Sequence, residues 1–392
     1  FNDPASTEIY TLSLHDALTI WATTWEGTIH ITSSNWTNWT TDYPQMFTGF
    51  GTAVDPYVLQ DVIINANGNN YGIYLQSPGA GVYFRIENCT VFNTSMGYTD
   101  AGIYIYNGHN GIVKNSSVYN CSRGISIDTG WNTYISVEEN TIYNNTEIGI
   151  SFNTASHNMI RNNTVIGNKI GIEIASVNSE NYTIIENFLS NNSWADIDIE
   201  YAKNTTINNN TCIYGKSLTG YGSLFLNNGV NATVFNNTIS HSDGPGIRAY
   251  FAHDSIIENN MVNYSEEQGI LVQYTNNCTV QNNNLVECLA NEFHAGGIAV
   301  RDSQFIKILN NSVEGAQYGF WTEWSEYLQI DNNDLLSNTK GGILMSNVNH
   351  TSLNDIYMEE GTDYGLDIRM CTNVSATNID AKYFDEAGLH LG

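Results

Sequence analysis

A short motif returns along this chain at a spacing of about 23 residues: a glycine, an apolar residue, any residue, and a second apolar residue. Its clearest copies begin at Gly102, Gly124, Gly149, Gly171, Gly269, Gly342 and Gly365. The alternation predicts a short strand with one buried face, and the glycine predicts a turn that opens it. Further short strands with paired asparagines lie between the copies, as in 160–165 and 234–239. A repeat of this length predicts an all-β solenoid with two or three strands in each turn.

Asparagine recurs at one fixed position of these intervening strands. Alignment on their first apolar residue places one asparagine per coil in a single column: Asn140, Asn163, Asn187, Asn210, Asn237, Asn260, Asn283, Asn311 and Asn333. Parallel strands lie about 4.8 Å apart, so an inward amide can donate to one neighbouring amide and accept from the other. Since an unpaired buried polar group costs about 1 to 3 kcal/mol, the column predicts an internal asparagine ladder. Cys89 and Ser116 occupy the column in the two preceding coils, so the ladder is expected to begin at Asn140.

These repeats resemble those of right-handed parallel β-helix proteins of the NosD-like, carbohydrate-binding and sugar-hydrolase repeat group. The resemblance covers residues 50–392 and includes segment 51–59, which is similar to the first-coil lead-in of many archaeal members. It implies a single right-handed parallel β-helix of about 13 to 14 coils. It does not select a function, because the same architecture carries lyases, hydrolases, epimerases, adhesins and passive envelope components.

The repeat pattern also divides the chain. Residues 1–19 match no repeat and resemble a translated sequencing-adapter read, so we expect a non-native leader. Residues 20–50 contain four tryptophans and are expected to form an N-terminal cap or opening coil over the apolar end. The β-helix is expected to occupy residues 51–392. No polar cap follows the last coil at 388–392, so we expect either a longer native chain or self-association through this uncapped end.

The charge balance restricts the partners. The chain has 13 Lys and Arg against 40 Asp and Glu, a formal net charge of −27. Such a chain repels nucleic acid, and it disfavours polyanionic polysaccharides, whose binding clefts need basic residues. It has no apolar run of about 18 residues, so no direct membrane insertion is expected. A low fraction of charged residues, 14%, together with abundant Asn, Ser and Thr, is typical of secreted β-solenoids. We therefore expect an extracellular or cell-surface protein whose partners are neutral glycans or other cell-surface components.

Two further residue types bear on this location. Asn-x-Ser/Thr sequons are frequent, for example at Asn93, Asn181 and Asn231, and N-glycosylation is expected at some that face outward. The six cysteines show neither Cys-x-x-Cys nor metal-ligand spacing, which indicates small buried thiols. If a disulfide forms, Cys278 with Cys288 is the expected pair.

One acidic cluster stands out on the outer face. Residues between the inward apolar positions form two outward columns on one flat sheet. Glu173 then lies directly below Asp198, with Glu200 beside it and Asp196 at the strand start. Separations of about 5 Å between strands and about 7 Å along one strand bracket those that glycosidases use. Three interpretations stay open: a solvated acidic patch, a Ca²⁺ site formed by all four residues, or an acid/base pair of Asp198 with Glu173 or Glu200. No other cofactor is expected.

The aromatic segment 319–327 is a second candidate. Trp321 should face outward on the same sheet, while Trp324 and Tyr327 lie in the following turn. Tyr104 should lie on the same face towards the other end. Exposed flat rings suit stacking on sugars, so these residues are candidates for neutral glycan binding. The alternative is that the aromatic residues pack a loop onto the solenoid.

Enzyme signatures of the wider fold class are missing. The alginate-epimerase type Asp-Pro-His is absent, because Asp55-Pro56 is followed by Tyr57. The leading hypothesis is therefore a secreted or cell-surface solenoid with a structural, adhesive or glycan-binding role. The alternative is a carbohydrate-active enzyme, a polysaccharide hydrolase or lyase, that uses the acidic cluster on the outer sheet face.

Overall fold

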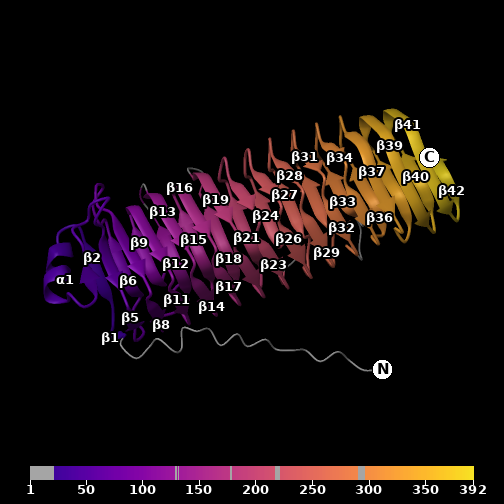
Figure 1. Cartoon of the computed structure of the whole chain (residues 1–392). Helices are drawn as coiled ribbons and strands as arrows, with labels where there is room; N and C mark the ends of the chain where they lie inside the picture. Colours follow the sequence, from indigo (N-terminus) through magenta and orange to yellow (C-terminus); the bar gives the residue numbers. More distant parts are fainter. Residues whose placement is uncertain (1–21, 129, 131, 177–178, 217–220, 290–295) are drawn as a thin grey trace, which may run out of the picture.

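The computed structural model describes residues 22–128, 130, 132–176, 179–216, 221–289 and 296–392. The chain winds into a long rod of stacked coils, with helix α1 (Trp36–Asp42) at the N-terminal end of the rod (Figure 1). The non-native leader predicted at 1–19 lies outside the described residues. No helix in the described part of the chain is long and apolar enough to cross a membrane.

Two long sheets form the sides of the rod. In both sheets, strands from neighbouring coils pair in parallel, except for the short antiparallel pair of β3 with β4. The 15-stranded sheet, called the front sheet below, contains β2 (Ile29–Thr32), β6 (Tyr71–Gln76), β9 (Ala101–Tyr106), β12 (Arg123–Asp128), β15 (Ile148–Asn153), β18 (Ile170–Ala175), β21 (Ala195–Glu200), β24 (Leu224–Asn227), β27 (Ile247–Tyr250), β30 (Ile270–Gln273), β33 (Gly296–Arg301), β36 (Tyr318–Glu323), β38 (Gly341–Ser346), β40 (Tyr364–Arg369) and β42 (Ala387–Leu391).

The other sheet has 27 strands and closes the rest of each coil. It contains β1 (Thr23–Glu26), β3 (Phe47–Thr48), β4 (Tyr57–Gln60), β5 (Val62–Asn65), β7 (Phe84–Glu87), β8 (Thr90–Phe92), β10 (His109–Lys114), β11 (Ser117–Tyr119), β13 (Asn132–Glu138), β14 (Thr141–Tyr143), β16 (Ala155–Arg161), β17 (Thr164–Ile166), β19 (Glu180–Ile185), β20 (Phe188–Ser190), β22 (Thr206–Asn208), β23 (Thr211–Ile213), β25 (Thr233–Phe235), β26 (Thr238–Ser240), β28 (Ile256–Glu258), β29 (Met261–Asn263), β31 (Thr279–Gln281), β32 (Asn284–Val286), β34 (Lys307–Leu309), β35 (Ser312–Glu314), β37 (Gln329–Leu336), β39 (Asn349–Gly361) and β41 (Thr372–Phe384).

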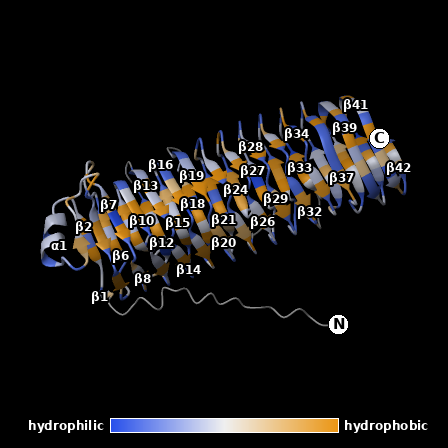
Figure 2. Ribbon diagram, in the orientation of Figure 1, coloured by the Kyte–Doolittle hydropathy of each residue, from blue (hydrophilic) through white to orange (hydrophobic). Residues whose placement is uncertain are grey.

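The core is a stack of aliphatic side chains inside the coils. Ile150, Ile172 and Ile197 are aligned on neighbouring front-sheet strands, and all three are fully buried. Figure 2 shows the resulting hydrophobic bands that run from coil to coil along the rod. The predicted all-β parallel solenoid is confirmed.

The repeated glycines have a different role from the predicted turn. Gly149 is the second residue of β15, so it lies within a strand. A Cβ there would lie 2.6 Å from the carbonyl oxygen of Gly171 and 2.6 Å from Val165 Cγ1. The glycine is thus required because the neighbouring coil approaches closely, and the turn interpretation was wrong.

The two asparagines of each pair have different roles, one in the turn and one inside the coil. The first residue of a pair takes a left-handed turn, as Asn162 (φ 54°), Asn236 (φ 55°) and Asn282 (φ 55°) do. Asparagine adopts this conformation more readily than most residues because its short side chain can bond locally. The second residue of each pair then points into the coil.

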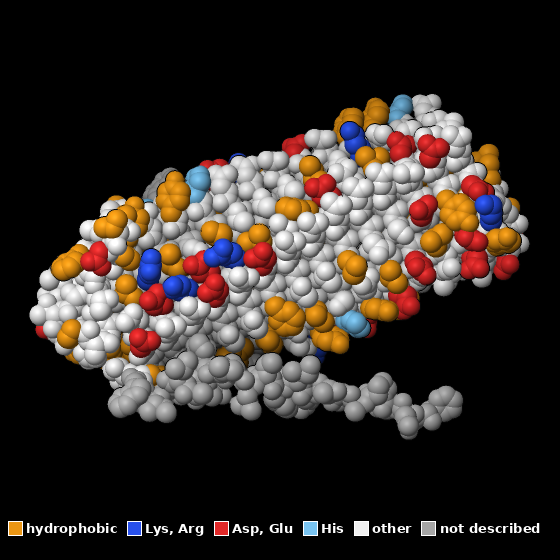
Figure 3. All heavy atoms as spheres, viewed as in Figure 1, with side chains coloured by type: hydrophobic (Ala, Val, Ile, Leu, Met, Phe, Trp, Pro, Cys, Tyr) orange, Lys and Arg blue, Asp and Glu red, His pale blue; other side chains and the backbone are white. Residues whose placement is uncertain are grey.

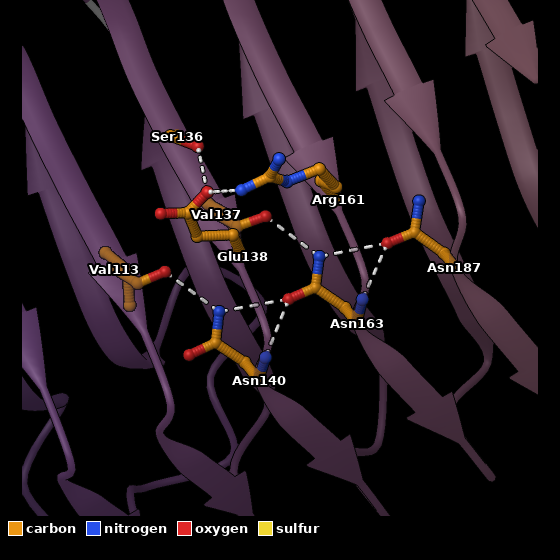
Figure 4. A network of polar contacts seen from close by, with 8 residues as sticks. All are labelled: Val113, Ser136, Val137, Glu138, Asn140, Arg161, Asn163 and Asn187. Carbon is orange, nitrogen blue, oxygen red and sulfur yellow. Dashed lines mark hydrogen bonds and ion pairs between the residues drawn. The ribbon is translucent and has the colours of Figure 1, made fainter.

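The predicted asparagine ladder is confirmed over its whole length. Each Nδ2 donates to the Oδ1 of the next ladder residue at 2.9 to 3.1 Å, from Asn140 to Asn333. The same Oδ1 also accepts the backbone N–H of the preceding ladder residue, as Asn163 and Asn187 show in Figure 4. Before the ladder, Ser116 Oγ accepts from the Cys89 backbone N–H at 3.1 Å. The ladder therefore begins at Asn140, as predicted.

The described cysteines are all free thiols, so the expected Cys278–Cys288 disulfide was wrong. Both residues are buried in the aliphatic stack, where each thiol replaces a small apolar side chain. The buried-thiol interpretation holds for these two residues.

Candidate functional site

The outward columns predicted for the front sheet are present in the predicted register. Glu173 of β18 pairs with Asp198 of β21, and Ala175 of β18 pairs with Glu200. The first column continues on both sides, with Ser151 before Glu173 and Phe225 after Asp198. Three carboxyl groups therefore occupy neighbouring positions on two adjacent strands.

Two of these carboxyl groups, those of Glu173 and Asp198, are partly or fully withdrawn from solvent. Only 1% of Asp198 is exposed, and Glu173 is partly buried. Burial raises the pKa of Glu173 to about 7, although Arg123 and Lys169 oppose the increase and Glu200 adds to it. Burial, with the charges of Glu200 and Glu173, raises the pKa of Asp198 well above its usual range. Because charged carboxylates resist burial beside one another, the surroundings of Asp198 favour its neutral form.

Aromatic side chains from outside the two strands surround this cluster. The Tyr221 hydroxyl senses the charges of Asp198, Glu200 and Glu173, which raise its pKa in addition to burial. Its ring lies 5.6 Å from that of Trp194. Tyr221 therefore brings an aromatic ring close to the carboxyl groups, with the Trp194 ring beside it.

Two basic side chains complete the surroundings. The Arg123 guanidinium lies 4.6 Å from the centroid of the Tyr98 ring, and its Nε donates to the Tyr98 carbonyl oxygen at 3.0 Å. The Lys169 ammonium lies 3.9 Å from the centroid of the Trp194 ring and 2.7 Å from Glu147. Each cation has its own partners, so neither forms an open anion site.

One oxygen of the cluster has no partner among the described residues. Asp198 Oδ1 is buried and forms no hydrogen bond with any described residue. An unsatisfied buried polar atom costs about 1 to 3 kcal/mol, and such atoms in native proteins are commonly functional. Asp198 thus keeps a hydrogen-bonding position available at the centre of the cluster.

Asp196 does not join the other three carboxyl groups. Its Oδ1 accepts from Asn192 at 2.8 Å, and its Oδ2 accepts from the Ser223 hydroxyl at 2.6 Å. Burial raises its pKa to about 6, and these two hydrogen bonds limit the increase. Among the described residues, no group of three or more His, Cys, Asp or Glu has the arrangement of a metal site. The structure therefore gives no support to a calcium site formed by all four residues.

Asp196 instead ends a second asparagine ladder that the sequence did not reveal. Asn145, Asn168 and Asn192 stack with Nδ2 to Oδ1 distances of 3.0 and 3.2 Å. In the next coil the ladder position is Gly215, whose Cβ would lie 2.6 Å from Asp196 Oδ2. The carboxylate therefore occupies the space that a further asparagine would fill.

The repeat changes at several positions together in this coil. Asp196 stands in the column of Gly149 and Gly171, and Ser223 follows it. Cys212 replaces the larger Leu189 of the preceding coil. The smaller neighbour leaves room for a side chain at the glycine position. These departures coincide with the strand that carries Asp198 and Glu200.

The structure separates the predicted aromatic residues. Trp321 lies on β36, and Trp324, which is 55% exposed, lies in the turn after it, as predicted. Tyr327 stacks between Phe305 and His350 at ring distances of 4.8 and 4.9 Å along another edge of the rod. This arrangement matches the loop-packing alternative for that residue.

Tyr104 is not available for sugar stacking. It lies on the predicted front-sheet column, paired with Tyr74 and Ser126, but only 7% of it is exposed. Its ring stacks on Tyr71 at 4.6 Å. The structure therefore places it in an aromatic cluster on β6 and β9, far along the sheet from Trp321.

Sequence reasoning missed the residues that surround the acidic cluster. Tyr98, Trp194 and Tyr221 precede front-sheet strands without belonging to the repeated motif, so no periodic signal marked them. Trp194 was the only one with a local indication, since it comes immediately before the strand of Asp198.

Several solved structures are similar to this chain. Among solved structures, the catalytic unit of a GH87 alpha-1,3-glucanase from Streptomyces thermodiastaticus has a TM-score of 0.50 at 12% identity, over 85% of this chain and 64% of that chain. The A-module of mannuronan C-5 epimerase AlgE6 of Azotobacter vinelandii has a TM-score of 0.47 at 14% identity, over 84% of this chain and 92% of that chain. An alginate lyase from Paenibacillus sp. has a TM-score of 0.42 at 14% identity, over 73% and 95%.

At these identities the likeness concerns the fold. No curated protein matches the sequence. The family model described as a right handed beta helix region matches residues 51–189, 171–335 and 296–392. Together these matches cover the whole repeat region, so the chain belongs to the right-handed β-helix family.

Proposed function

We propose that this protein is a carbohydrate-active enzyme that cleaves a neutral polysaccharide at the cluster of Glu173, Asp198 and Glu200. The observation that carries the proposal is the pKa of Glu173, which burial raises to about 7 on an outer sheet face beside two other carboxyl groups. A carboxyl group with such a pKa is protonated often enough at neutral pH to act as a general acid.

The three carboxyl groups suit different roles. Glu173 is the general acid that protonates the leaving glycosidic oxygen. Glu200 lies diagonally across from it, one strand and one column away, and serves as the carboxylate partner that activates water or attacks the sugar. Asp198 has its Oδ1 unpaired among the described residues and surroundings that favour the protonated form, and in that form it donates a hydrogen bond to the bound sugar.

The surroundings favour a neutral substrate. A uronate polymer would bring more carboxylates next to a cluster in which Glu200 already raises the pKa of Glu173, and both raise the pKa of Asp198. Arg123 and Lys169 are engaged by Tyr98 and by Glu147 with Trp194, respectively. Figure 3 shows acidic side chains in several places over one face of the rod, with a few basic side chains beside some of them. Like charges in a site of this kind repel by several kcal/mol.

Reducing-sugar release over a panel of neutral glucans, xylan and mannan, with alginate as the anionic comparison, tests the proposal. Glu173→Gln is expected to lower kcat on the cleaved neutral polymer by about 100-fold or more, as is Glu200→Gln. Glu323→Gln is the matched control, because Glu323 lies in the same outward column as Glu200 but several strands away. Equal activity of Glu173→Gln and Glu323→Gln, or no turnover of any neutral polymer, would contradict the proposal.

A further inference from the structure

A line of exposed aromatic residues follows one edge of the front sheet. In four coils an aromatic residue immediately after the front-sheet strand takes a left-handed turn, with φ of 57° at Tyr201, 49° at Phe251, 51° at Tyr274 and 50° at Trp324. Bulky residues adopt this conformation at a cost, which asparagine avoids at the same place in other coils, as at Asn228. The turns alone therefore do not explain these aromatic residues.

Between Tyr274 and Trp324 the line is interrupted by a short side chain. Phe251 and Tyr274, in adjacent coils, stack with ring centroids 5.1 Å apart and planes 15° apart. The next coil has Asp302 at this position, and Trp324 follows one coil later. Two coil spacings amount to about 10 Å, about the distance needed to place one flat ring between two others. Asp302 is too short to fill this gap.

A groove of about 570 Å³ lies at the interruption. Tyr274 and Trp324 line it as aromatic walls, and Asp302, Gln304 and Glu326 supply oxygen and amide groups. His253 also lines the groove, and its Nδ1 accepts the backbone N–H of Asn276 at 3.0 Å. A neutral ring with Nδ1 as acceptor carries its proton on Nε2, so His253 can donate.

The polar groups of the groove select the class of ligand. No Lys or Arg is among the described residues that line it, and two carboxylates are: Glu326, and Asp302, whose Oδ2 lies 3.2 Å from Arg301 Nε outside the lining. The lining itself thus offers an anionic group no cation, whereas hydroxyl groups could donate to the carboxylates and accept from the Gln304 amide. A ring with two apolar faces and a rim of hydroxyl groups fits these walls and this polar lining.

We propose that this groove is a second, non-catalytic subsite that holds one sugar unit of a neutral polysaccharide between Tyr274 and Trp324. The same edge leads back to the acidic cluster, because Tyr201 directly follows Glu200. Glu200 and Arg301, the residue before Asp302, lie in one column, four strand spacings or about 19 Å apart. A single polysaccharide chain along this edge can occupy both places.

Affinity electrophoresis in gels that contain one neutral polysaccharide tests the subsite without requiring turnover. Trp324→Asn is expected to weaken retention by about tenfold, because it removes one aromatic wall. Asparagine suits the left-handed turn, so the fold is expected to persist. The matched control is Tyr134→Asn, which replaces another exposed aromatic residue in a left-handed turn, with φ of 58°, outside the front sheet.

The outcomes separate this subsite from the acidic cluster. Retention that Trp324→Asn weakens, but that Tyr134→Asn and Glu173→Gln leave unchanged, supports the subsite whether or not the protein cleaves the polymer. Retention that is equal in Trp324→Asn and wild type overturns it. Retention by alginate alone, or by none of the neutral polymers, also overturns it.

Discussion

The asparagine ladder offers a direct test of what holds the coils together. Asn282, Asn283 and Asn284 are consecutive but have three different environments. Asn282 takes the left-handed turn, Asn283 is a ladder residue with 1% exposure, and Asn284 is exposed on β32. Asn283→Ala and Asn284→Ala therefore compare the same chemical change, inside and outside the coil, at adjacent positions.

The structure gives the size of the expected effect. Asn283 Oδ1 accepts from the backbone N–H and from Nδ2 of Asn260 at 2.9 and 3.0 Å, and its Nδ2 donates to Ile257 O and Asn311 Oδ1. After truncation, Asn260 Nδ2 keeps Val234 O, but the Asn260 backbone N–H loses its acceptor. One orphaned buried donor, with the net loss of the remaining bonds, amounts to about 3 kcal/mol.

Urea unfolding followed by circular dichroism measures the difference. We expect Asn283→Ala to reduce the free energy of unfolding by about 3 kcal/mol, and Asn284→Ala to change it by less than about 0.5 kcal/mol. Because a solenoid can open locally, amide exchange of the Asn260 coil provides a second readout, with faster exchange only in Asn283→Ala. If the two variants unfold within about 0.5 kcal/mol of each other, the ladder does not stabilise the stack as argued.

Two further predictions concern protons. If Glu173 is the general acid, kcat falls as pH rises through about 7. Lys169→Gln is expected to move this decline to higher pH, because Lys169 lowers the pKa of Glu173. A kcat–pH profile that is the same in Lys169→Gln and wild type contradicts the assignment. The folded-state pKa of Asp196, about 6, lies above its ordinary 3.8, so the folded protein binds more protons between these values and loses stability as pH rises through them. Asp196→Asn, which can keep both hydrogen bonds, is therefore expected to raise the melting temperature at pH 8 more than at pH 4, and an equal change at both pH values would refute this reasoning.

Much of the architecture was predictable because it is periodic. The outward columns were correct from Tyr74 to His390, since the motif recurs once per coil and strand alternation fixes which side chains face outward. The ladder was predictable for the same reason, because a buried amide in one coil requires a partner at the same position in the next. Local geometry was less accessible: the role of Gly149 depends on the distance to the neighbouring coil, which a sequence does not contain.

The chemistry of the candidate site was only half predictable. The sequence by itself placed Glu173, Asp198 and Glu200 side by side, because repeat spacing determines which residues become neighbours. Only the tertiary structure decided that Glu173 and Asp198 are desolvated, and that Tyr221 reaches the cluster from a non-repeating segment. It also separated Asp196 from the others, through its bonds to Asn192 and Ser223. Neighbours follow from periodicity, whereas burial and protonation depend on whatever else the fold brings to the same place.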